Sequence, residues 1–373
     1  MKVQGKHFET IWLKEDDATV VQIIDQRCLP FDFKLEDIVS PDGMYTAIRD
    51  MHLRGAPLIG VAGALGVYLA AKNAPDTDNP YKYIREKAEL LKSARPTAVN
   101  LAYCIDRVLV EMEKENNPGR KAERALKTAR QMMDEERLNS RRIGEYGVTI
   151  IEELSKAKKG RPVNILTHCN AGWLACIDYG TATAPIYMAH DRGLQVHVIV
   201  DETRPRNQGA KLTAWELQQH GVPHTLVVDN AGGHMMQKGL VDLVIVGGDR
   251  VSPYGDVVNK IGTYLKALAA SDNKIPFYVA IPSSSIDWNL KEGAQETPIE
   301  ERDIYEVRHM EGLVNESIAD MLIVPEHTPV ANYGFDITPA RFVAGIITER
   351  GITEANFKSI MNLFPEKHKI PLS

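Results

Sequence analysis

The sequence predicts an α/β protein in which a mainly helical N-terminal domain precedes a Rossmann-like, mostly parallel sheet with helices on both faces. From residue 163 onward, short continuous apolar runs alternate with helical stretches, which is typical of a parallel sheet buried between two helical layers. Before residue 135, amphipathic helical periodicity prevails and is interrupted by prolines and glycines. We therefore expect a helical domain over residues 1–134 and an α/β domain over residues 135–373.

The helical domain is expected to open with a strand at Thr19–Arg27, which is rich in β-branched residues. Ser40 is of a type that caps helices, and Pro57 suits the first turn of a helix, where its missing N–H costs little. The helices expected here are Met44–Leu53, one that starts at Arg54–Pro57, Tyr81–Ser93, Thr97–Lys114 and Arg120–Asn139.

The second domain alternates strands and helices. Its expected strands are Val163–Leu166, Val196–Val200, His224–Val228, Leu243–Val246, Phe277–Ile281 and Met321–Val324. Its expected helices are Trp173–Asp191, Gln208–His220, Ala231–Gly239, Lys260–Ala270 and Pro339–Arg350. Right-handed crossovers bring the carboxyl ends of parallel strands to one edge of the sheet, where ligands bind. Polar residues follow these strands and are expected to gather there: Cys169, Asp201-Glu202, Asp229-Asn230, Asp249-Arg250 and Ser283–Ser285.

The overall charge argues against nucleic acid and anionic membranes as partners. Lys and Arg number 44 against 50 Asp and Glu, which gives a net charge of −6. The N-terminus has no apolar signal-like segment, and no run of apolar residues is long enough to cross a bilayer. We expect a cytoplasmic protein.

Cys169 is the most informative of the four cysteines, because it follows an expected strand and precedes an expected helix. At such a turn, unpaired backbone N–H groups and the positive end of the helix stabilise a thiolate. The neighbouring His168 should point to the opposite side, as adjacent residues of an extended chain do. The cysteines expected to be ordinary reduced thiols are Cys28, Cys104 and Cys176. Neither the cysteine nor the histidine spacing is typical of a metal site, so no metal is expected.

Asp249 stands at a comparable place, after the apolar run Leu243–Val246. A soft acid or base and a carboxylate at the ends of neighbouring strands form a candidate catalytic pair. To act as an acid near neutral pH, Asp249 would have to keep a proton, which an apolar surrounding favours. Arg250 should point away from it by strand alternation.

The chain also carries scattered residues suited to an anion. Arg54-Gly55-Ala56 at a helix start combines backbone N–H groups with a guanidinium, and Arg95 and Lys260 could add positive charge. Gln208 could serve a ligand hydroxyl as donor and acceptor. No Walker A or strand-linked G-x-G-x-x-G motif occurs, so no nucleotide cofactor is indicated.

Long ordered motifs resemble the methylthioribose-1-phosphate isomerase family, which shares a superfamily with regulatory subunits of translation initiation factor 2B and with ribose-1,5-bisphosphate isomerases. The resemblance covers nearly the whole chain. Gly248 departs from it, since the family pattern has alanine there. The motifs are Arg54-Gly55-Ala56-Pro57, Arg95-Pro96-Thr97, His168-Cys169-Asn170-Ala171-Gly172, Asp201–Leu217, Gly248-Asp249-Arg250 and Gly255–Tyr264.

The resemblance implies a cofactor-free aldose–ketose isomerase of methionine salvage, and so of methionine biosynthesis, that acts as a homodimer. It makes Cys169 and Asp249 catalytic. The residues it assigns to substrate contact are Arg54, Gly55, Ala56, Arg95, Gln208, Asn259 and Lys260. The helical domain would thus contribute phosphate-binding residues to the catalytic α/β domain.

The implied reaction converts 5-methylthioribose 1-phosphate to 5-methylthioribulose 1-phosphate. A phosphate on the anomeric carbon prevents spontaneous ring opening, so an acid must protonate the ring oxygen, a role that we assign to Asp249. Cys169 would either move the C2 proton through an enol-type intermediate or stabilise the site during a hydride shift from C2 to C1. Both routes stay open from the sequence.

Two other functions are compatible with these motifs. One is isomerisation of a related pentose 1-phosphate such as 5-deoxyribose 1-phosphate, which an apolar pocket distinguishes by only about 1–3 kcal/mol. The other is a non-catalytic subunit like those of the translation factor. The joint presence of Cys169 and Asp249 favours an enzyme, since a pure scaffold needs neither.

Overall fold

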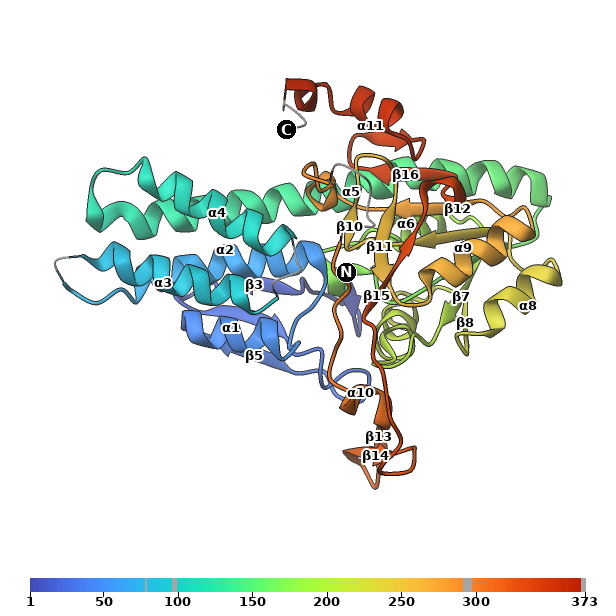
Figure 1. Cartoon of the computed structure of the whole chain (residues 1–373), viewed down its shortest axis with the longest axis horizontal. Helices are drawn as coiled ribbons and strands as arrows, with labels where there is room; N and C mark the ends of the chain where they lie inside the picture. Colours follow the sequence, from blue (N-terminus) through green and yellow to red (C-terminus); the bar gives the residue numbers. More distant parts are fainter. Residues whose placement is uncertain (78, 96–98, 291–296, 370–373) are drawn as a thin grey trace.

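The computed structural model describes residues 1–77, 79–95, 99–290 and 297–369, and it shows a helical unit beside a larger α/β unit (Figure 1). The helical unit also contains a three-stranded antiparallel sheet, in which β4 is shorter than the expected strand Thr19–Arg27. Ser40 caps α1 as expected, because its side chain accepts a hydrogen bond from the Gly43 N–H. The elements are β3 (Ile11–Leu13), β4 (Val21–Ile24), β5 (Leu35–Ile38), α1 (Pro41–Arg49), α2 (Ala56–Lys72), α3 (Pro80–Ser93) and α4 (Val99–Glu113).

Helix α2 is the buried centre of this unit and packs against α3, α4 and α5. Glycines let the neighbouring helices approach it closely. A Cβ on Gly60 would lie 2.9 Å from Cys104 Sγ, and one on Gly63 would lie 2.6 Å from Leu101 Cδ1. This packing fixes the N-terminal end of α2, which points towards the α/β unit (Figure 1).

Helix α5 (Lys121–Lys158) is much longer than the expected helix Arg120–Asn139 and connects the two units (Figure 1). Ala129 and Met133 of its first half belong to the helical core, whereas Ile143 and Val148 pack with the sheet. The boundary expected between residues 134 and 135 falls inside this helix. The division into domains 1–134 and 135–373 stays a prediction.

The α/β unit is built on a seven-stranded sheet in the order β17-β16-β12-β9-β6-β7-β8. Its neighbouring strands are parallel except for the pair β16 and β17. The expected α/β class with a mostly parallel sheet is therefore confirmed. The strands are β6 (Val163–Thr167), β7 (Val196–Asp201), β8 (His224–Val227), β9 (Leu243–Val246), β12 (Phe277–Ala280), β16 (Gly345–Thr348) and β17 (Gly351–Thr353).

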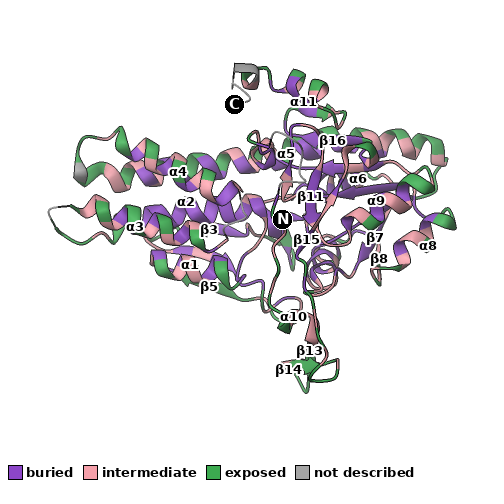
Figure 2. Cartoon of the chain, viewed as in Figure 1, coloured by how far each residue is buried: buried purple, intermediate pink, exposed green. Residues whose placement is uncertain are grey.

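Alternate strand residues enter two separate cores, one on each face of this sheet. Figure 2 shows the central strands as mostly buried, whereas β8 at one edge has intermediate and exposed residues. Ile165 and Ile245 face α5, α6 (Ala184–Asp191) and α7 (Ala214–His220). Leu166 and Val244 face the opposite core, to which α8 (Ala231–Gln237), α9 (Thr263–Asp272) and α11 (Phe357–Leu363) contribute. Helices thus cover both faces, as expected.

Three expectations for this unit are wrong. Of the expected helix Trp173–Asp191, only a 3-10 turn at Trp173–Ala175 and α6 are helical, because residues 176–183 fold back so that the Thr181 N–H reaches the Ala171 carbonyl. The expected helix Pro339–Arg350 contains β16, whose buried β-branched residues pair with β12. The expected strand at residues 321–324 overlaps β14, which belongs to a separate hairpin and not to the parallel sheet.

The remaining helices of the α/β unit follow the expected order with shifted starts. The expected helix Gln208–His220 begins as a π-helical turn at Gly209–Thr213 and continues as α7. Helix α9 starts at Thr263, because Lys260 ends a strand, β11.

The smaller elements extend from this framework. The hairpin of β13 and β14 projects from the body and is largely exposed (Figures 1 and 2). Within the described ranges, no helix combines the length and the apolar character needed to cross a membrane. The elements are β1 (Lys2–Val3), β2 (Lys6–His7), β10 (Arg250–Val251), β11 (Val257–Lys260), β13 (His309–Val314), β14 (Ser317–Leu322), β15 (Phe335–Thr338) and α10 (Tyr305–Arg308).

Candidate active site

A cavity opens where the carboxyl ends of β6 and β9 meet the N-terminal end of α2. This is the sheet edge at which the sequence places a ligand. Asn259 of β11 completes one wall. The predicted site residues that line this cavity are Arg54, Gly55, Ala56, Cys169, Asp249 and Asn259. An adjoining cavity adds Arg95 and shares Gly55, Ala56 and Asp249 with the first.

Cys169 is held on every side by hydrogen bonds and is 6% exposed. Its N–H donates to Thr203 Oγ1 at 2.8 Å, and its carbonyl accepts from Thr213 Oγ1 at 2.7 Å. Its thiol donates to Gln208 Oε1 at 3.2 Å, which places Gln208 beside the candidate catalytic sulfur. The backbone at Cys169 has a φ of 66°, an uncommon left-handed conformation for a side-chain-bearing residue.

The net shift at Cys169 runs against the expected stabilisation of a thiolate, although a hydrogen bond from the Asn170 N–H lowers the pKa of the thiol as expected. Burial raises the pKa of the Cys169 thiol above its ordinary value, and the charge of Asp249 adds to this, although Arg54 and Lys260 act in the opposite direction. The physical reason is the desolvation of the buried sulfur. The segment Trp173–Ala175 forms one 3-10 turn rather than the start of a long helix, so it provides little dipole to offset this desolvation.

Asp249 lies between β9 and β10, where its N–H donates to the Val258 carbonyl at 3.0 Å. On one side it faces the cavity of Cys169, and on the other it faces the adjoining cavity, to which Ile59 and Phe335 contribute apolar walls. Because Arg95 and Arg250 line the same cavity, Asp249 faces cations as well as apolar side chains, and the expected apolar setting stays a prediction. Arg250 forms an ion pair with Asp287 at 3.3 Å, and it lines the adjoining cavity together with Asp249.

Arg54, Gly55 and Ala56 bring the positive end of α2 to the cavity. Gly55 has a φ of 109°, and a Cβ there would lie 2.5 Å from the Ala175 carbonyl oxygen. Only glycine fits this position, which explains the Arg-Gly-Ala sequence in physical terms. The N-terminal end of α2, whose first N–H groups have no partner within the helix, and Arg54 therefore line one cavity, as an anion site requires.

Two further cations approach from other elements. Arg95 lies just after α3 and forms a long ion pair with Glu300, at 3.7 Å. Within the part of the chain that the structure describes, nothing accepts a hydrogen bond from its buried Nε. Lys260, at the end of β11, donates to the Gly334 carbonyl at 2.9 Å and lies over the Phe335 ring. Burial lowers the pKa of the Lys260 ammonium, while the nearby acidic groups Cys169 and Asp249, when ionised, act to raise it.

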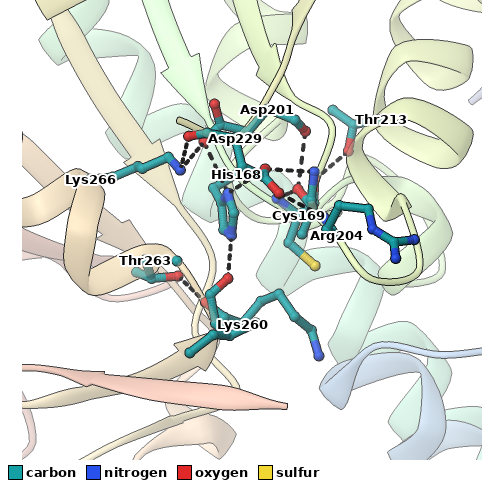
Figure 3. A network of polar contacts seen from close by, with 12 residues as sticks. His168, Cys169, Asp201, Arg204, Thr213, Asp229, Lys260, Thr263 and Lys266 are labelled. Atoms are coloured by element: carbon teal, nitrogen blue, oxygen red, sulfur yellow. Dashed lines mark hydrogen bonds and ion pairs between the residues drawn. The ribbon is translucent and has the colours of Figure 1, made fainter. Parts of the chain in front are cut away.

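His168 turns away from Cys169, as expected, and anchors a network that joins several strand ends (Figure 3). Its Nδ1 lies 3.0 Å from Asp201 Oδ2, and its Nε2 lies 2.8 Å from the Ile261 carbonyl. The ammonium of Lys266 lies 3.1 Å from the same Asp201 oxygen. Ile261 follows Lys260 directly, so this network also fixes the turn that carries Lys260.

One group of described side chains has the spacing of metal ligands, namely His168, Asp201 and Asp229. The Lys266 ammonium already neutralises Asp201 within this group and also donates to the Asp229 carbonyl at 2.5 Å. A second cation there would face the charge of Lys266 at close range. The donor set therefore fits a structural ion-pair network better than a metal centre.

Sequence reasoning gave no role to several buried polar residues that support the site. These residues lie inside the motifs on which the family resemblance rests, so their position in the sequence could have indicated a role in the site. Their contacts cross between β6, β7 and α7, which a linear pattern does not reveal. These residues are Asn170, Thr203, Thr213 and Glu216.

Together, the cavity offers a carboxyl group, a buried thiol and several cations around a helix N-terminus. Such a site can bind an anionic ligand and can exchange protons with it at a defined distance from the anion.

Comparison with known proteins identifies the family of this chain. The family model described as the initiation factor 2 subunit family matches residues 52–355. A methylthioribose-1-phosphate isomerase of Desulfatibacillum aliphaticivorans is 54% identical over 369 residues, which cover 99% of this chain and 100% of the relative. The enzyme of that name from Sinorhizobium medicae is 54% identical over 376 residues, which cover 98% of this chain and 100% of the relative.

Solved structures show the same fold. The 5-methylthioribose 1-phosphate isomerase of Pyrococcus horikoshii superposes with a TM-score of 0.82 at 36% identity, and 97% of each chain is covered. The translation initiation factor eIF-2B subunit delta of A. fulgidus gives 0.80 at 34% identity, with 96% of this chain and 100% of that chain covered. The chain therefore belongs to the initiation factor 2 subunit family and, within it, to the methylthioribose-1-phosphate isomerases.

Proposed function

We propose that this enzyme converts 5-methylthioribose 1-phosphate to 5-methylthioribulose 1-phosphate, the aldose–ketose isomerisation of methionine salvage. The observation that carries the proposal is the meeting of Cys169 and Asp249 at one cavity with the N-terminal end of α2. The curated relatives named above supply the substrate. A scaffold subunit would have no chemical need of this pair beside an anion site.

The substrate phosphate is proposed to bind at the first turn of α2. Arg54, Gly55 and Ala56 line the cavity at this helix start, and Arg95 lines the adjoining cavity. Lys260 lies close enough to Cys169, Asp249 and Arg95 to interact with their charges. Binding at this point places C1, which carries the phosphate, next to the cavity of Cys169 and Asp249. Orientation of C1 and C2 is then a consequence of phosphate binding.

Asp249 is proposed to start the reaction as the general acid. Its proton passes to the ring oxygen, and the bond between C1 and that oxygen breaks, leaving an oxocarbenium ion at C1. A hydride then moves from C2 to C1, and the hydroxyl proton on C2 returns to the Asp249 carboxylate as the ketone forms. The hydride stays within the substrate, so the step balances without an external oxidant or reductant.

Cys169 is proposed to act as a neutral thiol that stabilises the positively charged intermediate. Its raised pKa keeps the thiol protonated near neutral pH, which disfavours the route in which a thiolate removes the C2 proton. Its S–H is donated to Gln208, so the sulfur lone pairs are available towards the cavity. This arrangement favours the hydride shift over the enol-type route.

The proposal is tested by assaying the purified protein, without added metal or nucleotide and in the presence of a chelator, on three substrates. These are 5-methylthioribose 1-phosphate, 5-deoxyribose 1-phosphate and ribose 1,5-bisphosphate. We expect ketose formation from the first with the highest kcat/KM. Preference for 5-deoxyribose 1-phosphate would reassign the substrate, and no turnover of any of the three would overturn the enzyme mechanism. The expected homodimer and cytoplasmic location stay predictions, the first open to light scattering.

A further inference from the structure

Among the residues that the structure describes, Asn170, which directly follows Cys169, is the one that accepts hydrogen bonds from the Arg54 guanidinium. Arg54 Nη1 donates to Asn170 Oδ1 at 2.5 Å, and Nη2 donates to the Asn170 backbone carbonyl at 2.7 Å. Two parallel hydrogen bonds to one residue fix the plane of the guanidinium as well as its position. The direction in which Arg54 presents its other N–H groups therefore depends on how Asn170 is held.

Asn170 is held in turn by α7 and the turn before it. Its Nδ2 group donates to Glu216 Oε1 at 2.9 Å and to Thr213 Oγ1 at 3.1 Å. Because both of these partners accept, the amide nitrogen must face them and the amide oxygen must face Arg54. Asn170 is 3% exposed, so no bulk water competes for these contacts.

Glu216 is fully buried and accepts four hydrogen bonds, which makes it the fixed point of the chain of contacts. Besides Asn170, its donors are the Trp173 N–H at 3.1 Å, the Leu174 N–H at 2.9 Å and the Tyr187 hydroxyl at 3.0 Å. The carboxylate thus ties the backbone that follows Asn170 to α7. A Cβ on Gly172 would lie 1.7 Å from Glu216 Oε2, so the loop is folded directly around this group.

We infer that Asn170 and Glu216 are positioning residues of the reaction, which hold the Arg54 guanidinium in the orientation that receives the substrate phosphate. Asn170 lines the cavity beside Arg54, whereas Glu216 is not among its lining residues, and we assign to both the orientation of Arg54 rather than contact with the phosphate. This inference rests on the proposed function, in which Arg54 is a phosphate ligand. The Glu216 carboxylate would then orient Arg54 through Asn170, a role that packing alone would not require.

Two substitutions separate positioning from packing. Glu216→Gln keeps the shape of the side chain but replaces one acceptor oxygen by an NH2 group, which is a donor. Since each oxygen of Glu216 accepts a hydrogen bond from at least one N–H group, two donors must then face each other. Asn170→Ala removes the side-chain contact to Arg54 and leaves the backbone carbonyl contact in place. If Glu216→Gln fails to fold, Asn170→Ala still decides the question.

The readouts are KM, kcat and the inhibition constant of inorganic phosphate, measured on each variant with its melting temperature. We expect both variants to raise KM and the phosphate inhibition constant about tenfold, the size of one weakened charge-assisted contact, with a smaller fall in kcat. In an Arg54→Ala background, Asn170→Ala should add less than twofold, because its effect passes through Arg54. Fully additive effects, or unchanged phosphate inhibition in folded variants, would overturn the inference.

Glu136→Gln is the matched control, because Glu136 of α5 is also a buried glutamate but contacts Ser140 rather than Asn170. We expect the phosphate inhibition constant of Glu136→Gln to equal that of the wild type. If this constant rose equally in Glu136→Gln and Glu216→Gln, the effect would belong to any buried glutamate and the inference would fail. Arg54→Ala separates the two proposals. If it leaves phosphate inhibition unchanged, the phosphate site of the proposed function is wrong. If it weakens phosphate inhibition while Glu216→Gln does not, only the positioning role fails.

Discussion

Cys169 and Asp249 both follow a strand of the same sheet, yet they are built into the protein in different ways. Cys169 is buried, and its N–H, carbonyl and thiol form hydrogen bonds with Thr203, Thr213 and Gln208, respectively. Asp249 is partly exposed and lies where two cavities adjoin. The difference fits the two proposed roles. A thiol such as Cys169, which only stabilises a charge, can be held rigidly by the protein, whereas a carboxyl group such as Asp249, which donates and accepts a proton, must face the ligand.

The largest effect is expected where the proton is moved. Asp249→Asn keeps the shape but cannot donate an acidic proton, so kcat should fall by about 10²–10⁴, with KM little changed. Asp242→Asn is the control, because Asp242 precedes β9 at the opposite edge of the sheet and binds Lys158. That variant should lose stability and keep kcat. A near-normal kcat in Asp249→Asn would remove the assignment of the acid.

A smaller loss of kcat is expected for the substitution of Cys169. Cys169→Ser retains a donor to Gln208 but replaces the polarisable sulfur by a hard, shorter hydroxyl, so we expect kcat to fall about 10²-fold, in the range of other lost electrostatic contacts. The melting temperature should change little. Cys176→Ser, at another buried thiol, serves as the control for stability. An active Cys169→Ser enzyme would end the proposed role of the sulfur.

The pH dependence of alkylation tests whether the thiol is neutral. Since burial raises the pKa of Cys169 above the ordinary value of 9, the thiolate fraction is small at pH 7 and grows about tenfold per pH unit until the pKa is reached. Iodoacetamide should therefore label Cys169 slowly at pH 7 and faster at pH 9, with protection by substrate, as peptide mapping would show. Fast labelling at pH 7 would instead support a thiolate and the enol-type route.

The sequence predicted the sheet and the place of the site well. Strands β6, β7, β9 and β12 lie within one residue of their expected ends, because continuous apolar runs fit a strand buried on both faces. Once these strands are parallel, topology alone brings Cys169 and Asp249 to one edge. The residue types at that edge then indicated the chemistry.

Contacts between distant segments decided what the sequence did not predict. Helical periodicity in Trp173–Asp191 is overridden where residues 176–183 return to pair with Ala171. The state of the Cys169 thiol depends on how deeply the folded chain buries it, which no local pattern records. The same holds for the Asn170 and Glu216 contacts, which join segments more than 40 residues apart.

The smallest effect is expected at Gly248, where the sequence departs from the family pattern beside Asp249. A Cβ there would lie 3.0 Å from Ile281 Cγ2 and 3.3 Å from Val257 Cγ1, so alanine fits only if these side chains shift slightly. Gly→Ala exchange otherwise gains about 0.4–1 kcal/mol by restricting the unfolded chain. We expect these terms to offset, leaving the free energy of unfolding of Gly248→Ala within about 1 kcal/mol of the wild type. Its kcat should stay within about threefold, because Asp249 is held by the Val258 carbonyl through its own N–H. A larger fall in kcat at unchanged stability would mean that Asp249 needs a mobile backbone, and the contrast with the fixed Cys169 would then extend from the side chain to the main chain.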